Sequence, residues 1–277
     1  MSTGAERESE KRRSEETFDV LAHTYDEMRF LSLTAARLVE LAQLPRGARV
    51  LDVATGTGEV ALLAARAVGP SGAVIGIDLS PGMLGRARVK AAQAGLSQVE
   101  FREGDALRLD RPDESFDVVL SASSIFILPD MPAAVREWRR VLAPGGRVGF
   151  SSFGPAFLQP LQEMWAKHLR AHGLGGGAPP TERLTDAEAC RDLLRQAGLT
   201  PLAVHSEQLG YFLRTVEERW LDIEVGLEGM ALRQLDPGRR EALRQAHLAE
   251  LKGIATEEGV WVDVPALFAF GGALPAA

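Results

Sequence analysis

The segment Val50–Ala64, VLDVATGTGEVALLA, contains the residues whose types and spacing best suit ligand chemistry. An apolar strand ends near Asp52, a short loop follows, and a helix is expected to begin at Glu59. Gly56 and Gly58 in the loop have no Cβ, so a ligand can approach the backbone closely there. Open α/β folds bind ligands at the carboxyl ends of their strands. We therefore expect a binding site around this loop.

Further polar residues follow the next expected strands. Asp78 ends the second strand, Glu103–Ala106 (EGDA) follows the third, and Ser121 ends the fourth. A carboxylate at the position of Asp78 can accept hydrogen bonds from both hydroxyls of a ribose. An acid after the third strand suits the exocyclic amine of adenine, which is a hydrogen-bond donor. Together these positions predict a nucleoside-binding edge of a parallel sheet.

The loop leaves two classes of nucleoside ligand open. Residues 56–61, GTGEVA, satisfy the G-x-G-x-x-G/A pattern of dinucleotide-binding proteins. A pyrophosphate gains nothing from a carboxylate at Asp52, whereas a ligand that carries an ammonium and a sulfonium group is favoured beside it. A P-loop is excluded because no Gly-Lys-Ser/Thr triplet follows a glycine-rich turn, and no G-x-S-x-G elbow indicates an α/β-hydrolase.

Short apolar strands alternate with amphipathic helices over residues 46–153, which predicts a doubly wound, mostly parallel α/β sheet with a Rossmann-like fold. The expected pairs are Arg49–Val53 with Glu59–Val68, Ala73–Ile77 with Gly82–Ala94, and Phe116–Leu120 with Ala133–Val141, and the further strands are Val99–Phe101 and Gly146–Phe153. Beyond them we expect helices at Leu158–His172 and Ala187–Ala197, a strand at Leu202–Phe212, a helical insertion at Val216–Thr256, and a last strand near Val260–Phe270.

These elements suggest one catalytic domain with added helices. Residues 1–45 are expected to form an N-terminal helical cover, whose charged opening Glu6–Glu16 is interpreted as solvated helix. Residues 46–277 are expected to form the α/β domain, with helical cap insertions at about 154–183 and 214–258.

The amino-acid composition limits the binding partners and the cellular compartment that we expect for the protein. With 31 basic and 38 acidic residues the formal net charge is −7, so nucleic acid is not an expected partner. No apolar run reaches the roughly 18 to 20 residues of a membrane span, and the amino terminus lacks the apolar stretch of a secretory signal. Cys190 is the only cysteine, which fits a reducing compartment. We expect a cytoplasmic protein, either a monomer or a homodimer.

The motifs resemble those of a known family, the class I S-adenosylmethionine-dependent methyltransferases. The resemblance is carried by D-x-A-x-G-x-G from Asp52, an acid at Asp78, GDA at Gly104–Ala106, the FDVV strand from Phe116 and LAPGG from Leu142. The opening F-D-x-x-A-x-x-Y-D, residues 18–26, is similar to the ubiquinone and menaquinone biosynthesis branch. The specific motifs cover residues 18–153.

The resemblance implies S-adenosyl-L-methionine as cofactor, a small-molecule methyl acceptor, and a seven-stranded sheet with a final antiparallel strand. It also implies a set of cofactor-binding residues, in which Asp78 would hold the ribose, Leu79 and Met83 would sandwich the adenine, and the carbonyl of Ser121 would meet the methionine amine. The full set is Tyr25, Asp52, Ala54, Thr55, Gly56, Gly58, Asp78, Leu79, Met83, Gly104, Asp105, Ala106 and Ser121. Ala54 departs from the family, which has glycine there, but a methyl group is a small change.

The sequence does not select a catalytic base or predict a metal site. The five histidines show no HExxH motif or compact ligand spacing. The cap contains apolar residues that suit a small aromatic or lipophilic acceptor: Phe157, Trp165, Tyr211, Phe212, Trp220, Leu227 and Met230. Two alternatives to a methyltransferase stay open, an NAD(P)-dependent oxidoreductase and a non-catalytic S-adenosylmethionine-binding protein.

Overall fold

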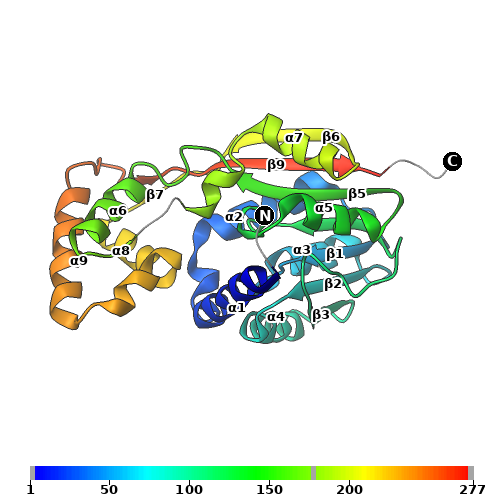
Figure 1. The fold of residues 1–277 in the computed structure, drawn as a ribbon, viewed down its shortest axis with the longest axis horizontal. Coiled ribbons are helices and arrows are strands. Elements are labelled where there is room, and N and C mark those ends of the chain that lie inside the picture. Colours follow the sequence, from blue (N-terminus) through cyan, green and yellow to red (C-terminus); the bar gives the residue numbers. More distant parts are fainter. Residues whose placement is uncertain (1–3, 176–178, 274–277) are drawn as a thin grey trace.

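The computed structural model describes residues 4–175 and 179–273, and its elements follow the expected alternation of strands and helices (Figure 1). The strands are β1 (Arg49–Val53), β2 (Ala73–Asp78), β3 (Val99–Glu103), β4 (Phe116–Ser121), β5 (Leu142–Phe153), β6 (Thr200–Gln208), β7 (Tyr211–Leu213), β8 (Val260–Val262) and β9 (Pro265–Gly272). The α-helices are α1 (Gly4–Leu21), α2 (Arg29–Ala42), α3 (Glu59–Val68), α4 (Pro81–Gln93), α5 (Met131–Arg140), α6 (Leu161–Ala171), α7 (Ala187–Gln196), α8 (Val216–Val225) and α9 (Pro237–Leu251). Short 3₁₀ helices are η1 (Tyr25–Glu27), η2 (Ile125–Ile127), η3 (Pro180–Arg183) and η4 (Leu227–Gln234).

The main sheet has seven strands in the order β3-β2-β1-β4-β5-β9-β6. Strands β1 to β5 pair in parallel, and β9 pairs antiparallel with both β5 and β6. The predicted doubly wound sheet with a final antiparallel strand is therefore confirmed. Strand order reverses between β1 and β4, so a crevice for ligands is expected at the carboxyl ends of these two strands.

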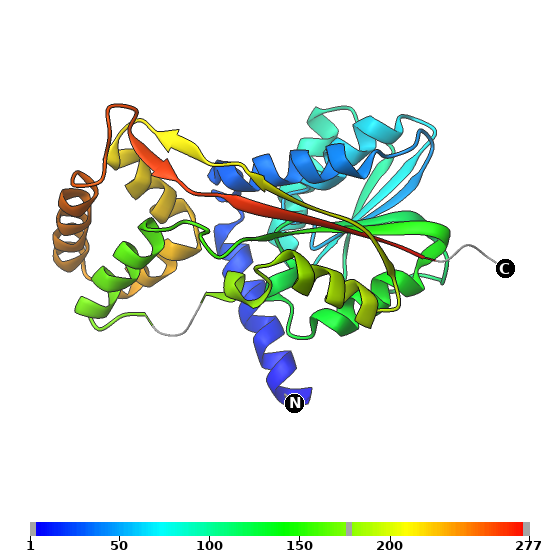
Figure 2. The ribbon, with the colours of Figure 1, turned by 90° about the horizontal axis from the view of Figure 1, so that it is seen from above.

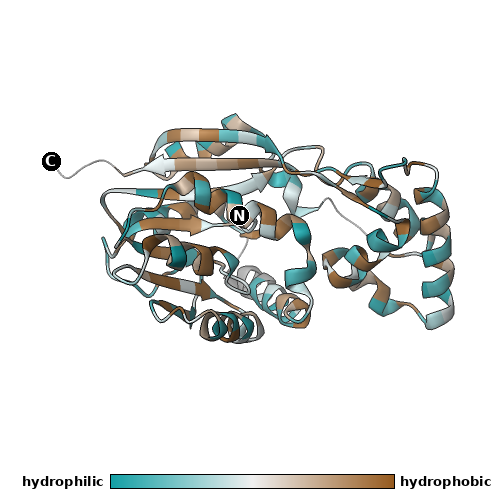
Figure 3. Cartoon of the chain, turned by 180° about the vertical axis from the view of Figure 1, so that it is seen from behind, coloured by the Kyte–Doolittle hydropathy of each residue, from teal (hydrophilic) through white to brown (hydrophobic). Residues whose placement is uncertain are grey.

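Two layers of helices cover the sheet because side chains on each strand alternate between its faces. Val50 and Val118 pack in a core with α2, α3 and α4, whereas their neighbours Leu51 and Val119 pack in a second core with α5 and α7. Trp138 of α5 is fully buried in the second core. Figure 3 shows the apolar residues concentrated on the strands and on the helices that cover them.

A helical cap lies beyond the end of the sheet to which the parallel strands point (Figures 1 and 2). Helices α6, α8 and α9 pack together there, beside a two-stranded sheet of β7 and β8. The expected continuous strands at 202–212 and 260–270 were wrong, because each is divided into two. The strands bend where Gln208 Oε1 accepts hydrogen bonds from the backbone N–H of Gly210 at 2.8 Å and of the distant Val264 at 3.0 Å, so this side chain takes the place of a main-chain acceptor.

Within residues 4–175 and 179–273, no helix combines the length and the apolar composition that a membrane span needs.

Candidate active site

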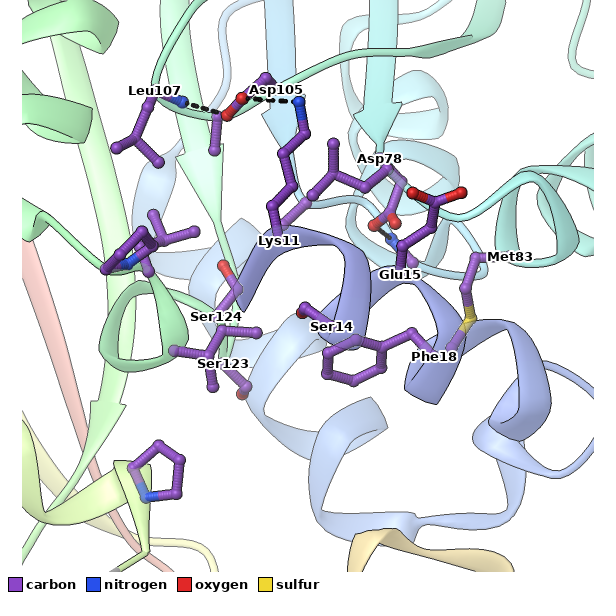
Figure 4. Close-up of a pocket in the computed structure, with 18 of the residues that line it drawn as sticks. Lys11, Ser14, Glu15, Phe18, Asp78, Met83, Asp105, Leu107, Ser123 and Ser124 are labelled. Atoms are coloured by element: carbon purple, nitrogen blue, oxygen red, sulfur yellow. Dashed lines mark hydrogen bonds and ion pairs between the residues drawn. The ribbon is translucent and has the colours of Figure 1, made fainter. Parts of the chain in front are cut away.

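A cavity of about 810 Å³ opens at the carboxyl ends of the central strands, with α1 along one side (Figure 4). Nine of the sequence-predicted site residues line it: Tyr25, Ala54, Gly56, Asp78, Leu79, Met83, Gly104, Asp105 and Ala106. They come from η1, from the loops that follow β1, β2 and β3, and from the first turn of α4. Residues separated by up to 81 positions in the chain thus meet in one place, as expected for strand ends in a parallel sheet.

Asp78 connects the loops after β1 and β2. Its carboxylate accepts hydrogen bonds from the backbone N–H of Gly56 at 2.8 Å and of Ser80 at 3.0 Å. Burial raises the pKa of this carboxyl group, although the backbone donors partly offset that effect. Each oxygen of the carboxylate has a further lone pair, so Asp78 can still accept hydrogen bonds from a ligand in the cavity.

Four predicted site residues, Asp52, Thr55, Gly58 and Ser121, do not line the cavity but lie beneath it. Asp52 is only 1% exposed, and its Oδ2 accepts hydrogen bonds from the Thr55 hydroxyl at 2.5 Å and the Ala61 backbone N–H at 3.0 Å. Burial raises the pKa of Asp52 to about 7. In this arrangement the Asp52 carboxylate braces the loop between β1 and α3.

Gly58 and Ser121 also support the cavity from below. Gly58 has a φ of +86°, and a Cβ at this position would lie 2.9 Å from the ring of Phe101, so only glycine fits. The Ser121 hydroxyl donates to the carbonyl of Val53 at 2.9 Å and lies 2.5 Å from the Ser124 hydroxyl. These bonds join the ends of β1 and β4 at the switch point of the sheet.

Helix α1 contributes residues that the sequence interpretation missed. Lys11, Ser14, Glu15 and Phe18 line the cavity, and Lys11 Nζ lies 3.0 Å from Asp105 Oδ2 (Figure 4). The expectation that the charged opening is merely solvated was therefore wrong for this face of the helix. The available signal was the spacing i, i+3, i+4, i+7, which places all four residues on one helical face.

The acidic residues of the F-D-x-x-A-x-x-Y-D motif attach the N-terminal segment to the α/β domain. Asp19 accepts hydrogen bonds from the Ser80 hydroxyl and, at 2.8 Å, from the backbone N–H of Gly82 in the first turn of α4. Asp26 accepts one from the Thr57 hydroxyl and pairs with Lys90 Nζ at 2.9 Å. A carboxylate at a helix amino terminus is stabilised by the unpaired N–H groups and the helix dipole.

Tyr25 from the same motif stands over the loop after β1. A Cβ on Gly56 would lie 3.4 Å from its ring. Burial and the nearby carboxylates of Asp78 and Asp26 raise the pKa of the Tyr25 phenol, so it stays neutral at physiological pH. Tyr25 therefore offers the cavity an aromatic face and a neutral hydroxyl.

A second cavity of about 620 Å³ lies between the first cavity and the helical cap. The two cavities share six lining residues: Phe18, Tyr25, Ser123, Ile127, Pro179 and Pro180. Among the apolar cap residues expected from the sequence, Phe157, Trp165, Tyr211 and Leu227 line the second cavity, whereas Phe212, Trp220 and Met230 are not among its lining residues. Its walls are rich in aromatic rings, such as the stacked pair Phe153 and Phe157, whose centroids are 3.9 Å apart.

Known proteins share this fold and its central segment. Residues 50–146 match the family model of a methyltransferase domain. The chain also has named relatives: the nocamycin O-methyltransferase of Saccharothrix syringae is 40% identical over 151 residues, which cover 54% of this chain and 53% of that protein. The demethylmenaquinone methyltransferase of Deinococcus radiodurans is 45% identical over 150 residues, covering 51% of this chain and 60% of that protein.

These relatives are matched over little more than half of their own lengths. Among solved structures, a SAM-dependent methyltransferase from Aquifex aeolicus has a TM-score of 0.55 at 23% identity, over 67% of this chain and 90% of that chain. The resemblance to class I S-adenosylmethionine-dependent methyltransferases of the quinone-biosynthesis type is confirmed by the fold and by these matches.

The residues of the first cavity fit the cofactor of this family, S-adenosylmethionine. Its volume lies within the range of about 300 to 1,000 Å³ that is usual for small-molecule sites. Asp78 supplies acceptor oxygens for ribose hydroxyls, and the side chains of Leu79 and Met83 supply apolar surface for a flat base. The loop at Gly56, with a φ of +53°, allows the close backbone approach that a bound ligand needs.

Proposed function

We propose that this protein transfers a methyl group from S-adenosylmethionine to a small-molecule acceptor. The observation that carries the proposal is the junction of the two cavities, where a cavity that suits a nucleoside and a cavity rich in aromatic rings share Phe18, Tyr25 and Ser123. Two ligands bound side by side would meet at this junction. Such placement of reactants can lower a reaction barrier by several kcal/mol.

In this proposal each cofactor contact has its own part of the site. Asp78 holds the ribose hydroxyls, Leu79 and Met83 pack against the adenine, and Asp105 with the backbone of Ala106 reads its edge. Ala54, Gly56 and Gly104 allow close approach of the backbone, and Tyr25 covers the methionine end. Asp52, Thr55, Gly58 and Ser121 act through the loops that they brace.

A sulfonium supplies an activated methyl group, so the chain mainly has to position the acceptor and exclude water. The aromatic walls of the second cavity suit a ring-containing acceptor, because offset and edge-on ring contacts stabilise such ligands. The rings of Phe30 and Phe157 already show an edge-on arrangement, with centroids 5.3 Å apart. The accepting atom in this proposal is an oxygen, a nitrogen or a carbon of that molecule.

The test has two arms. S-adenosylhomocysteine should raise the melting temperature of the protein and NADH should not, since an oxidoreductase would show the reverse. Incubation with S-adenosylmethionine labelled on the methyl group and a panel of aromatic hydroxy compounds should then give a labelled product. Binding without any transfer across the panel would favour the non-catalytic alternative.

We also propose a domain organisation, a cellular compartment and an oligomeric state for this protein. Residues 1–45 form the helical cover and residues 46–277 form the catalytic domain with cap insertions at about 154–183 and 214–258. The net charge of −7 and the single, buried Cys190 support a cytoplasmic protein with a small-molecule partner rather than nucleic acid. A monomer or a homodimer is proposed, and sedimentation at micromolar concentration would distinguish the two.

A further inference from the structure

The mostly aromatic and apolar wall of the second cavity includes the exposed Arg170 of α6 and a charged stretch on α8 and η4. Arg219 and Asp222 on α8, together with Glu228 at the start of η4, all line the cavity. A charged group in an apolar cavity loses hydration, and it is retained at low cost only where it has partners. The hydrogen-bond partners of these three side chains therefore indicate which polar group a ligand needs in order to bind here.

Arg219 and Glu228 form an ion pair, although Arg219 Nε has no hydrogen-bond partner among the described residues. The Arg219 side chain is almost fully buried, and its Nη2 donates to both carboxylate oxygens of Glu228 at 2.8 and 2.7 Å. The pair is fixed in place, because a planar guanidinium and a carboxylate in this geometry restrain each other. Both carboxylate oxygens of Glu228 thus already accept a hydrogen bond from the protein.

Asp222 is different. It lies one helical turn after Arg219 and is half-buried at the cavity wall. Within residues 4–175 and 179–273 the structure shows no hydrogen bond to its carboxylate. The charged groups that face it are Arg219 and Arg29, which favour its ionised form, and Glu228 and Glu218, which oppose it.

The ionisation state of Asp222 follows from this balance. Burial raises the pKa of its carboxyl group to about 6, with Arg219 opposing the shift. Asp222 is therefore mostly ionised at pH 7.5 and accepts hydrogen bonds without donating any. A hydrogen-bond donor on a ligand in the second cavity would therefore bind to the Asp222 carboxylate.

We propose that Asp222 accepts a hydrogen bond from a hydroxyl group of the methyl acceptor and thereby orients its ring system in the second cavity. The acceptor class is a flat, mostly apolar, ring-containing molecule with a free hydroxyl. The assignment rests on the proposed function only in identifying the occupant of this cavity as the methyl acceptor. Asp222 is a positioning and specificity-determining residue, and Arg219, fixed by Glu228, keeps it ionised.

The test uses two probes of the same ring system, 1-naphthol and 1-methoxynaphthalene, which differ in the hydroxyl donor. Calorimetric titration of the full chain at pH 7.5 should show 1-naphthol binding about 10-fold more tightly, the size expected for one hydrogen bond to a charged group. In Asp222→Leu, which keeps the shape but removes the acceptor, this preference should disappear while 1-methoxynaphthalene binds at least as tightly as before. Asp222→Asn should keep a preference of a few-fold, because its amide oxygen still accepts a hydrogen bond.

Glu217→Leu is the matched control, since Glu217 is an exposed acid on the same helix and is not among the cavity-lining residues. It should keep the wild-type preference. The proposal is overturned if the wild type does not distinguish the probes, if Asp222→Leu keeps the 10-fold preference, or if that variant weakens both probes equally.

The readout is independent of the cofactor. A protein that selects 1-naphthol through Asp222 but is not stabilised by S-adenosylhomocysteine would refute the proposed methyl transfer and leave this inference standing. Stabilisation by S-adenosylhomocysteine without selection of the hydroxyl would do the opposite.

Discussion

Replacing Asp78 with alanine should weaken the binding of S-adenosylhomocysteine by roughly 10- to 150-fold. The expectation follows from the position of Asp78, whose carboxylate lines the first cavity and is held in place by the backbone N–H groups of Gly56 and Ser80. Because the protein fixes the carboxylate before a ligand arrives, little entropy is lost when ribose hydroxyls bind to it.

The magnitude comes from the hydrogen bonds that are lost. A hydrogen bond to a charged group contributes about 1.5 to 3 kcal/mol, and about 1.4 kcal/mol corresponds to a tenfold change in affinity. Asp78→Ala also leaves two backbone donors without their partner, so the free energy of unfolding should fall by about 1 to 3 kcal/mol. Asp78→Asn keeps one acceptor oxygen, so its affinity for S-adenosylhomocysteine and its free energy of unfolding should both fall less than those of Asp78→Ala.

The assay is calorimetric titration with S-adenosylhomocysteine, together with urea unfolding in the absence of ligand, which measures the stability loss separately. Asp110→Ala is the control, because Asp110 is exposed and is not among the residues that line the cavity. A ligand analogue without the ribose 2′-hydroxyl should bind the wild type more weakly but bind Asp78→Ala almost as well as the complete ligand does. An affinity of Asp78→Ala within threefold of wild type would show that the ribose does not bind at Asp78.

Three further predictions test the supports of the site. Burial raises the pKa of Asp52 to about 7 in the folded protein, above its unfolded value. The stability that Asp52 contributes is therefore present below about pH 4 and is lost as the pH rises. The free energy of unfolding of Asp52→Asn, measured with urea, should rise relative to wild type by up to about 4 kcal/mol between pH 4 and 8. An Asp52→Asn difference that is flat with pH would contradict this. Asp19→Ala should release α1 from α4 at a cost of about 1 to 2 kcal/mol and speed tryptic cleavage of α1 by about 5- to 30-fold, whereas Glu16→Ala, on the exposed face, should leave the rate unchanged. Gly58→Ala should destabilise by about 2 kcal/mol or more, but Gly85→Ala, inside α4 with open space around it, should stabilise by up to about 1 kcal/mol in the same thermal unfolding experiment.

The sheet and the floor of the first cavity could be predicted because their signals are local. Strand β1 and helix α3 have the predicted bounds, since an unbroken apolar run is followed by glycines that only a tight turn accommodates. The helix predicted from Leu158 begins instead at Leu161, after Pro160, because a proline disfavours the helical conformation of the residue before it. Residues at strand ends gather at one edge of a parallel sheet whatever the rest of the chain does.

The cap and its cavity could not be predicted, because they depend on contacts between distant segments. The bend at Gln208 is made by its side chain reaching Val264, 56 residues away, and nothing in the sequence near either residue indicates it. Asp222 looks like any exposed acid on an amphipathic helix until η1 and η4 pack against α8. A cavity formed by several segments has no periodic signature in any one of them.

The N-terminal segment gives the two cavities a shared wall, and this has a thermodynamic consequence. Phe18 and Tyr25 line both cavities, and their positions depend on the contacts of Asp19 with α4 and of Asp26 with Thr57 and Lys90. A ligand in the first cavity that packs against these rings stabilises the docked position of α1 and η1. The second cavity needs the same docked position, so binding in one cavity must favour binding in the other by the same factor. Loss of the Asp19 contact should therefore weaken both ligands, although Asp19 itself is not among the residues that line either cavity.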